Sequence, residues 1–278
     1  MQISKVATQV VQVIWDSLRL FTRTEGLSWG GAVGLYLFLS VPPLMVASAL
    51  GSQVLFTERE AERFVLEQAT KFVPAQEDLL AGVFEGDAGG TIATAVVALA
   101  FLLFSGSRAF AALSGGVNVM WRQSDKVSFW RRQAMRAWML GVSLLLLVVA
   151  SLGEFAIGLA SDAGTGSDQV WLLDWHLLPS ALLVIFLYIA YKSLPEDEVP
   201  WGHAAIGAVV ATIGIRISQA VMGVMSEAGT FETPYGELAG VAVLATWAFV
   251  VGVIALFGAT IVAVLSGRLE EIEAAGSD

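Results

Sequence analysis

The chain contains no cysteine, and charged residues are scarce in it. Without cysteine there can be no disulfide, no thiolate metal site and no cysteine nucleophile. Of the 278 residues, 56% are hydrophobic and only 14% are charged. An ordinary soluble domain carries about 25% charged residues. The composition therefore predicts an integral membrane protein.

Positive charge and histidine are also in short supply. Fifteen Lys and Arg stand against 25 Asp and Glu, for a net charge of −10, so no basic surface is available to bind nucleic acid. The two histidines, His176 and His203, are predicted on opposite sides of the membrane and cannot share a metal ion. The chain shows no phosphate-binding glycine loop and no Ser-His-Asp motif. We therefore expect no enzyme activity, no metal site and no cofactor.

Long apolar segments dominate the rest of the sequence. A helix needs roughly 20 apolar residues to cross the hydrocarbon core of a bilayer. Six segments are expected to do so, the fourth being the shortest: Trp29–Phe56, Gly90–Val119, Ala134–Leu159, Leu177–Tyr191, Trp201–Met225 and Leu238–Leu265. The predicted fold is all-α, a polytopic bundle of six transmembrane helices over residues 28–266. A cytoplasmic amphipathic segment, 1–27, precedes the bundle, and a short cytoplasmic tail, 267–278, follows it.

The distribution of Lys and Arg predicts the orientation, because cytoplasmic loops are enriched in these residues. Three precede the first span, six lie between the apolar cores of the second and third spans, and one follows each of the fourth and sixth spans. Only three fall in the loops of the other side. Both chain ends are therefore predicted to be cytoplasmic, in a multi-pass protein of the cytoplasmic (inner) membrane.

Two segments outside the spans are predicted to be amphipathic surface helices. The first has apolar residues at helical spacing: Ile3, Val6, Val10, Val13, Ile14, Leu18 and Phe21. It either lies along the membrane surface, with Lys5 and Arg19 toward water, or packs as a cytoplasmic helix under the bundle. The second, residues 58–73, is in the first external connection and is expected on the outer surface or as a cap on the bundle.

Arg216 lies deep in the fifth span. An arginine does not deprotonate in proteins, and its guanidinium is costly to place in hydrocarbon unless it faces a carboxylate, backbone carbonyls or a water-filled cavity. Glu154, Glu237 and Glu232 are the candidate carboxylates near the outer ends of neighbouring spans. Two interpretations follow. Either a buried ion pair braces the helices, or Arg216 contacts an anion or lipid headgroup in a cavity.

Other polar or helix-breaking residues lie within the first and second spans. Ser40, Pro42 and Pro43 predict a helix break of the kind found at transporter sites, or else an ordinary kink. Arg108 is close enough to the cytoplasmic end of its span to snorkel toward water. Asn118 is expected to form a hydrogen bond to another helix.

The spans also suggest an internal repeat. Gly106-Ser107-Arg108 in the second span is similar to Gly214-Ile215-Arg216 in the fifth, and each arginine lies far along an apolar run. Six spans with both ends cytoplasmic could form two triplets of opposite orientation. Inverted repeats are a known transporter architecture. Short matches between glycine-rich membrane segments also arise by chance.

Several phrases, taken together, resemble the YihY/BrkB family of six-helix bacterial and archaeal membrane proteins. They are Leu103-Phe104-Ser105-Gly106-Ser107-Arg108 with Leu113 and Asn118; Tyr36, Ser40 and Pro42-Pro43; Leu194-Pro195 with Trp201; and Tyr235-Gly236-Glu237-Leu238 with Trp247 and Gly258-Ala259. The family commonly has glutamate after that Gly-Ala pair, where this chain has Thr260. The resemblance implies an inner-membrane protein of poorly defined role. An old family label, ribonuclease BN, conflicts with the lack of metal-binding residues and of a basic surface.

Two functions are expected. The first is a transporter or translocator of an anionic or amphipathic small molecule or lipid, through a cavity near Arg216. Its polar residues would be Arg216, Arg108, Glu154, Glu237, Asn118 and Tyr235. The alternative is a non-transporting membrane scaffold or envelope-assembly factor. Membrane lipids are expected partners in both cases, and the small residues of the helices allow a homo-oligomer.

Overall fold

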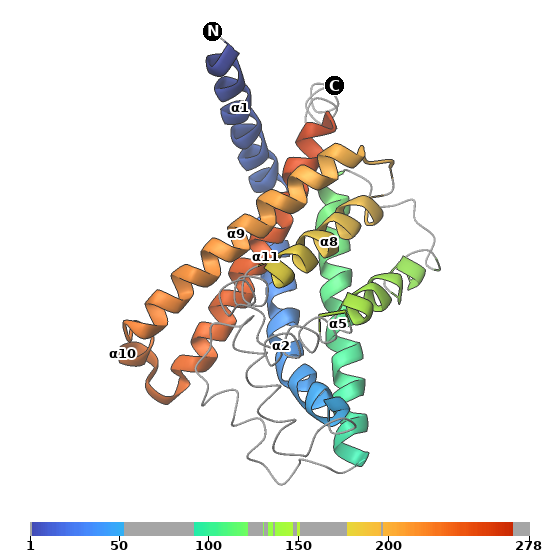
Figure 1. Ribbon diagram of the computed structural model, residues 1–278, viewed down its shortest axis with the longest axis vertical. Helices are drawn as coiled ribbons and strands as arrows, with labels where there is room; N and C mark the ends of the chain where they lie inside the picture. The colour runs from blue at the N-terminus through green and yellow to red at the C-terminus, as the bar shows by residue number, and fades with distance from the viewer. Residues whose placement is uncertain are drawn as a thin grey trace, which may run out of the picture. The chain divides into compact units, whose positions relative to one another are not determined.

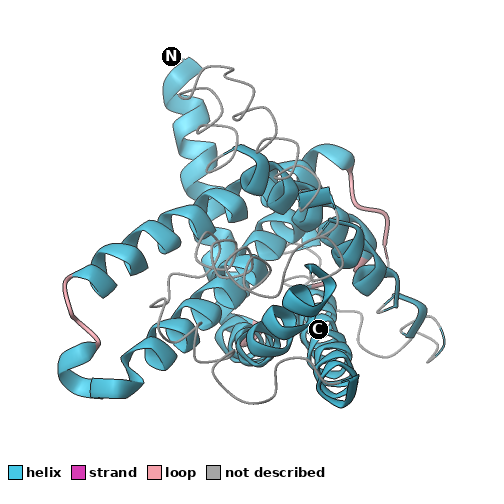
Figure 2. Cartoon of the chain, turned by 60° about the horizontal axis from the view of Figure 1, so that its bottom comes forward, coloured by secondary structure: helices cyan, strands magenta, loops and turns pink. Residues whose placement is uncertain are grey.

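The structure is a computed structural model that describes residues 2–52, 92–121, 130, 133–135, 137–146, 149–150, 177–195 and 197–268 (Figure 1). These residues are helical apart from short connections, and none of them is in a strand (Figure 2). The all-α class is therefore confirmed for the described part of the chain. The predicted surface helix at 58–73 lies outside it.

The first two helices are separated by a two-residue turn. Helix α1 covers Gln2–Arg23, which confirms that the amphipathic N-terminal segment is a helix, and α2 covers Gly26–Ser52. At the turn the Thr24 N–H donates to the Leu20 carbonyl at 3.0 Å and the Glu25 N–H donates to the Thr22 carbonyl at 3.3 Å. Glu25 has a φ of 54°, a left-handed conformation that ends α1.

Four described helices are long and apolar enough to cross a membrane. They are α2, α5 (Ile92–Met120), α9 (Trp201–Glu227) and α11 (Ala239–Leu265). Their segments of membrane-spanning length are, in the same order, Gly26–Met45, Leu99–Met120, Trp201–Ser226 and Ala239–Leu265. Each coincides with a predicted span. The fourth predicted span corresponds to α8, Leu178–Ser193, whose 16 residues are too few for a full crossing by length alone.

Two parts of the topology remain predictions. In the third predicted span, residues 137–146 and 149–150 are helical, and its remainder from 151 onward lies outside the described residues. Four spans out of six are thus matched within the described part, and neither the number six nor the cytoplasmic placement of the chain ends is tested. Between α9 and α11 the chain forms the short helices α10, Glu232–Tyr235, and η2, Gly236–Leu238 (Figure 1).

The chain divides into two compact units. Unit 1 comprises residues 1–29, 113–214 and 254–278, and unit 2 comprises residues 30–112 and 215–253. Each of the four long helices contributes residues to both units. Within unit 2, the second half of α9 and the first half of α11 form a helical hairpin joined by α10 and η2.

Unit 1 is built around α11. The buried phenol of Tyr191 on α8 donates a hydrogen bond to the Ala255 carbonyl at 2.6 Å. A Cβ at Gly258 would lie 2.5 Å from the Tyr191 hydroxyl, so only glycine permits this contact. Thr260, at the position where the resemblance expects glutamate, is fully buried, and its Oγ1 donates to the Leu256 carbonyl at 3.0 Å. Its hydroxyl is therefore satisfied by the carbonyl of its own helix.

Unit 2 is held by a close contact between α2 and α11. A Cβ on Gly252 would lie 2.3 Å from the Gly30 carbonyl oxygen and 2.8 Å from the Gly34 nitrogen. Gly34 in turn lies against the backbone of Phe249, where a Cβ would be 2.6 Å from the Phe249 Cα. The two backbones therefore touch, as small residues allow in membrane helices.

Candidate functional site

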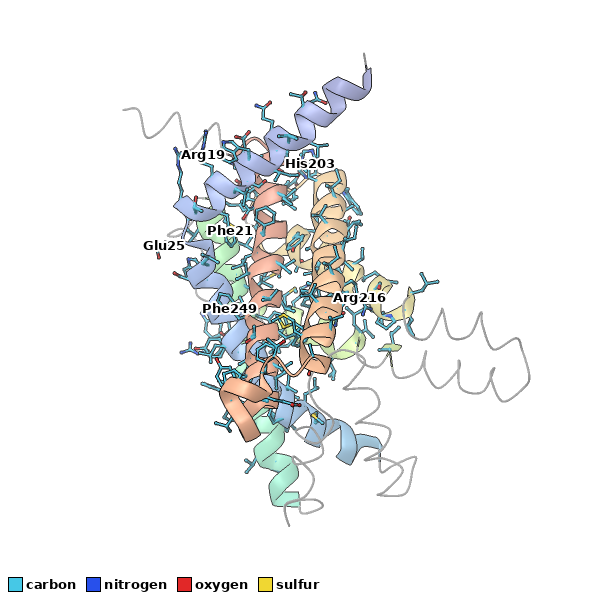
Figure 3. All side chains as sticks on the ribbon, turned by 90° about the vertical axis from the view of Figure 1, so that its left-hand side faces the viewer. Arg19, Phe21, Glu25, His203, Arg216 and Phe249 are labelled. Carbon is cyan, nitrogen blue, oxygen red and sulfur yellow. The ribbon has the colours of Figure 1, made fainter. Side chains whose placement is uncertain are left out.

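Arg216 lies well inside α9. It is the sixteenth of 27 helical residues, so about 22 Å of helix precedes it and about 16 Å follows it. Its neighbour Ile215 is buried and Ile217 is exposed, while the Arg216 side chain is half-buried (Figure 3). The guanidinium is therefore placed deep in a helix long enough to span the membrane, as the sequence predicts.

The Arg216 side chain is positioned by a neighbour on its own helix. Its Nη1 donates a hydrogen bond to Oε1 of Gln219 at 2.9 Å. The three-residue separation puts both side chains on one face of α9. Because the Gln219 amide is neutral, this bond orients the guanidinium without cancelling its charge. Gln219 was not singled out by the sequence, although its i+3 spacing from an intramembrane arginine is a signal that could have identified it.

The predicted carboxylate partners of Arg216 cannot be placed against it. Glu154 lies outside the described residues. Glu237 is in η2, but its side chain is also outside them. Glu232 begins α10, and its side chain is exposed. The proposed ion pair therefore stays a prediction.

A hydrogen bond between two serines connects α2 and α5 within unit 2. Ser40 Oγ and Ser105 Oγ lie 3.0 Å apart, and each hydroxyl also lies within hydrogen-bond distance of a carbonyl one turn earlier, that of Tyr36 at 2.6 Å and that of Phe101 at 2.8 Å. Ser40 donates its single proton either to Ser105 or to the Tyr36 carbonyl. Ser105 is fully buried. The sequence indicated Ser40 as part of a helix break and did not indicate its contact with Ser105.

Helix α2 continues through Pro42 and Pro43. Its helical residues run from Gly26 to Ser52 with both prolines inside, so an interruption that divides the span into two half-helices is not what this segment shows. Each proline removes one N–H donor, but its fixed φ is compatible with a helix. Pro43 is buried and Pro42 is exposed.

Arg108 is exposed on α5. Its guanidinium carbon lies 6.0 Å from the centroid of the Phe104 ring, which precedes it by one turn. Such contacts are worth about 0.5–1 kcal/mol at exposed sites. Ser105 is buried against α2, whereas the side chain of Arg108, three residues later along the same side of α5, is exposed. Arg108 and Arg216 both belong to unit 2.

The remaining predicted site residues are elsewhere. Asn118 belongs to unit 1, and its Nδ2 donates to Ser114 Oγ at 3.3 Å on the same helix, where a bond to another helix was expected. Its Oδ1 is buried without a hydrogen-bond partner. Tyr235 is 53% exposed in α10 and stacks on Phe231 at a centroid distance of 6.4 Å. The structure thus joins Arg216 to Gln219 and Ser40 to Ser105, and separates Asn118 from both pairs.

Unit 1 also contains a polar cluster that the sequence did not indicate. The α8–α9 connection is tied to the end of α11 by an ion pair between Arg268 and Asp197 and by a contact of 3.1 Å between His203 Nδ1 and Ser266 Oγ. Lys192 donates to the Val199 carbonyl and lies 5.3 Å from the Trp201 ring centroid. These contacts join neighbouring helix ends.

The two units differ in which large side chains they bury. Among the described residues, the largest fully buried side chains lie in unit 1, with the exception of Val243. Those of unit 1 include Tyr191, Met120 and Leu256. Unit 2 instead holds both intramembrane arginines and the Ser40–Ser105 pair. Asn118, by contrast, belongs to unit 1.

Comparisons with known proteins agree with this architecture. A family described as "Virulence factor BrkB" matches residues 17–278. The chain is similar to a UPF0761 membrane protein of Tolumonas auensis, with 28% identity over 240 residues that cover 82% of this chain and 76% of the relative. A UPF0761 membrane protein of Vibrio atlanticus is 25% identical over 281 aligned positions, which cover 95% of this chain and 86% of that relative.

A UPF0761 membrane protein of Rhodospirillum centenum is 27% identical over 176 residues, which cover 59% of this chain and only 37% of that relative. No solved structure matches the chain. The family match extends over nearly the whole sequence and includes all four helices that could cross a membrane. The chain is therefore a membrane protein that belongs to the BrkB family.

Proposed function

We propose that the chain is a transporter or translocator in the cytoplasmic membrane, and that Arg216 contacts the anionic group of its substrate. The substrate class is an anionic or amphipathic small molecule or a lipid. The observation that carries the proposal is the half-buried Arg216 guanidinium, held by Gln219 inside a helix of membrane-spanning length.

The energetics of a charge within a membrane support this assignment. Arginine at the centre of a transmembrane helix costs about 2.5–3.5 kcal/mol on insertion scales. The hydrogen bond from Nη1 to the Gln219 amide orients the guanidinium, whose planar donors suit an anionic group. Intramembrane arginines usually face the interior of a bundle or a water-filled cavity, and they mark substrate paths by default.

The division of the chain offers further support. Unit 1 provides a closely packed frame around α11, whereas unit 2 holds Arg216, Arg108 and the two prolines of α2. Prolines in a membrane helix remove backbone donors, so nearby carbonyls need protein or water as partners. A unit with charged and polar groups at membrane depth is suited to an amphipathic substrate.

The alternative is a non-transporting scaffold or envelope-assembly factor in which Arg216 only braces the helices. If Arg216 forms such a brace, it requires a carboxylate partner, and replacing Arg216 should change stability and function together. A substrate contact predicts that they change separately.

A reconstitution assay tests the proposal. The purified chain would be placed in phosphatidylcholine vesicles that carry traces of fluorescent phosphatidylglycerol or fluorescent phosphatidylcholine, and dithionite would report transfer between leaflets. Potassium phosphate uptake, followed by light scattering, would report passage of a small anion. We expect transfer of an anionic probe to exceed that of the zwitterionic lipid. Rates equal to those of protein-free vesicles for every anionic probe would refute transport and favour the scaffold.

A smaller effect is expected at the Ser40–Ser105 hydrogen bond. Hydrogen bonds between membrane helices contribute about 0.6 kcal/mol on average and about 1.7 kcal/mol at most. The variants Ser40→Ala, Ser105→Ala and their combination should therefore give a coupling energy in this range, measured by unfolding in mixed detergent micelles. Ser218→Ala is the matched control, because Ser218 Oγ donates to the Ile215 carbonyl of its own helix. Additive effects of the two substitutions would show that the serine pair does not stabilise the contact.

A further inference from the structure

The apolar side of helix α1 has a packed part and an exposed part. The first is packed: Ser17 and Leu20 are fully buried, and the Phe21 ring contacts Phe257 of α11 edge-on at a centroid distance of 5.7 Å. The second, here called the α1 strip, is exposed. It consists of Val10, Val11, Ile14, Trp15 and Leu18, with exposed fractions between 44% and 66%. At helical spacing these five residues form one continuous surface.

The side of α1 away from the strip is polar. Gln9, Gln12, Asp16, Arg19 and Arg23 recur at intervals of three and four residues and form one face. Figure 3 labels Phe21 and Arg19 on this helix. The helix therefore presents a polar side and an apolar side, and the apolar side is packed at Leu20 and Phe21 and exposed along the α1 strip.

The junction with α2 fixes the end of α1 beside the start of a membrane-spanning helix. Helix α1 ends at Arg23, and the membrane-spanning segment of α2 begins at Gly26. The intervening Thr24 and Glu25 can extend over only about 7 Å. A Cβ on Gly26 would lie 2.3 Å from the Phe21 ring, so the start of α2 is seated directly on the end of α1. The C-terminal end of α1 is therefore held at the start of a helix long enough to cross a membrane.

The charge of α1 matches an anionic surface. The segment Gln2–Arg23 has three basic residues and one acidic residue, in a chain with a net charge of −10. Basic amphipathic helices with an aromatic residue on the apolar side typically lie in the membrane interface. Tryptophan also prefers the headgroup level. Charge, shape and location therefore indicate the same occupant for the exposed surface.

We propose that the α1 strip is inserted into the interface of an anionic lipid leaflet and that α1 anchors the chain to that surface. The packed surface of Leu20 and Phe21 sets the rotation of the helix, so the strip is held toward lipid. This proposal does not depend on transport.

Site-directed labelling tests the anchor, and the natural absence of cysteine makes single-cysteine variants straightforward. Val11→Cys and Ile14→Cys report on the α1 strip, and Gln9→Cys and Gln12→Cys are matched controls on the polar face. Each full-length variant, carrying a nitroxide spin label, would be reconstituted with phosphatidylglycerol and phosphatidylcholine. Accessibility to oxygen and to a water-soluble nickel chelate would then be compared. Elution as a single species before labelling would establish folding.

We expect the strip labels to be several-fold more accessible to oxygen than to the nickel chelate, and the polar-face labels to show the reverse. Replacing phosphatidylglycerol by phosphatidylcholine should reduce this contrast. Equal accessibility of the nickel chelate to all four labels would place the strip in water and overturn the proposal. Dipolar coupling between strip labels of separate chains would overturn it in favour of a second copy. An unchanged contrast in phosphatidylcholine alone would overturn the requirement for anionic lipid.

Discussion

Replacing Arg216 with glutamine is expected to lower the rate of fluorescent phosphatidylglycerol transfer by roughly 10- to 100-fold. The expectation follows from the loss of a charged donor, because a hydrogen bond to a charged group contributes about 1.5–3 kcal/mol. Such a difference corresponds to one or two powers of ten in rate or affinity. Arg216→Lys should retain part of the activity, since it keeps the charge and loses the planar donor geometry.

The thermal stability of each variant has to be measured together with its lipid-transfer rate. If Arg216 contacts the substrate, Arg216→Gln should unfold at a similar temperature to the original chain. If it braces a carboxylate, removing one partner leaves an uncompensated charge and costs about 3–5 kcal/mol. Neutralising Glu154 or Glu237 should then restore stability to the glutamine variant. Unchanged transfer by Arg216→Gln would contradict the proposed contact.

Arg108→Gln is the matched control for that experiment. Arg108 also lies well inside a long apolar helix of unit 2, but its side chain is exposed and lies against Phe104. We expect its replacement to change the transfer rate much less than replacement of Arg216. An equal loss in both variants would indicate a general effect of charge on reconstitution rather than a specific contact.

Gly252→Val is expected to give the largest loss of stability among single substitutions at the α2–α11 contact. Even the first added carbon would lie 2.3 Å from the Gly30 carbonyl oxygen and 2.8 Å from the Gly34 nitrogen. Both are backbone atoms, which cannot rotate away. Overpacking of this kind costs about 1–3 kcal/mol, and occasionally more. Thermal unfolding in detergent, followed by loss of the monodisperse elution peak, measures it.

Gly223→Ala provides the comparison for that variant. A Cβ at Gly223 of α9 would meet nothing within 4 Å. Alanine is favoured over glycine in a helix by about 0.8–1.0 kcal/mol, so this variant should be at least as stable as the original chain. If Gly252→Val were as stable as Gly223→Ala, the backbone contact between α2 and α11 would not exist in the folded protein.

The positions of the long helices could be predicted from the sequence. The predicted Trp201–Met225 and Leu238–Leu265 correspond to α9, Trp201–Glu227, and α11, Ala239–Leu265. Length and apolar composition suffice for this, since a membrane-spanning helix satisfies its own backbone. The start of α2 was predicted three residues late, at Trp29. The structure begins this helix at Gly26, because the left-handed Glu25 ends the preceding helix regardless of hydropathy.

The contacts of the candidate site were less predictable, because they depend on which helices are neighbours. A serine in an apolar run gives no indication of its partner, so the Ser40–Ser105 bond required the structure. Asn118 satisfies its amide nitrogen within its own helix, an outcome that sequence spacing permits but does not select. The paired prolines were predicted to break or to kink this span, and α2 is helical through both of them.

Because the connection between α1 and α2 has only two residues, the number of residues between the α1 strip and Phe21 matters more for the orientation of the strip than the identity of single side chains. An α-helix advances by about 100° per residue, and Phe21 is fixed against both Gly26 and Phe257. One residue added before Ser17 would leave that contact intact and rotate the preceding turns by about 100°, so the polar Asp16 and Gln12 would take the places of Trp15 and Val11 in the α1 strip. In this part of the chain, insertions and deletions are therefore expected to be more damaging than substitutions.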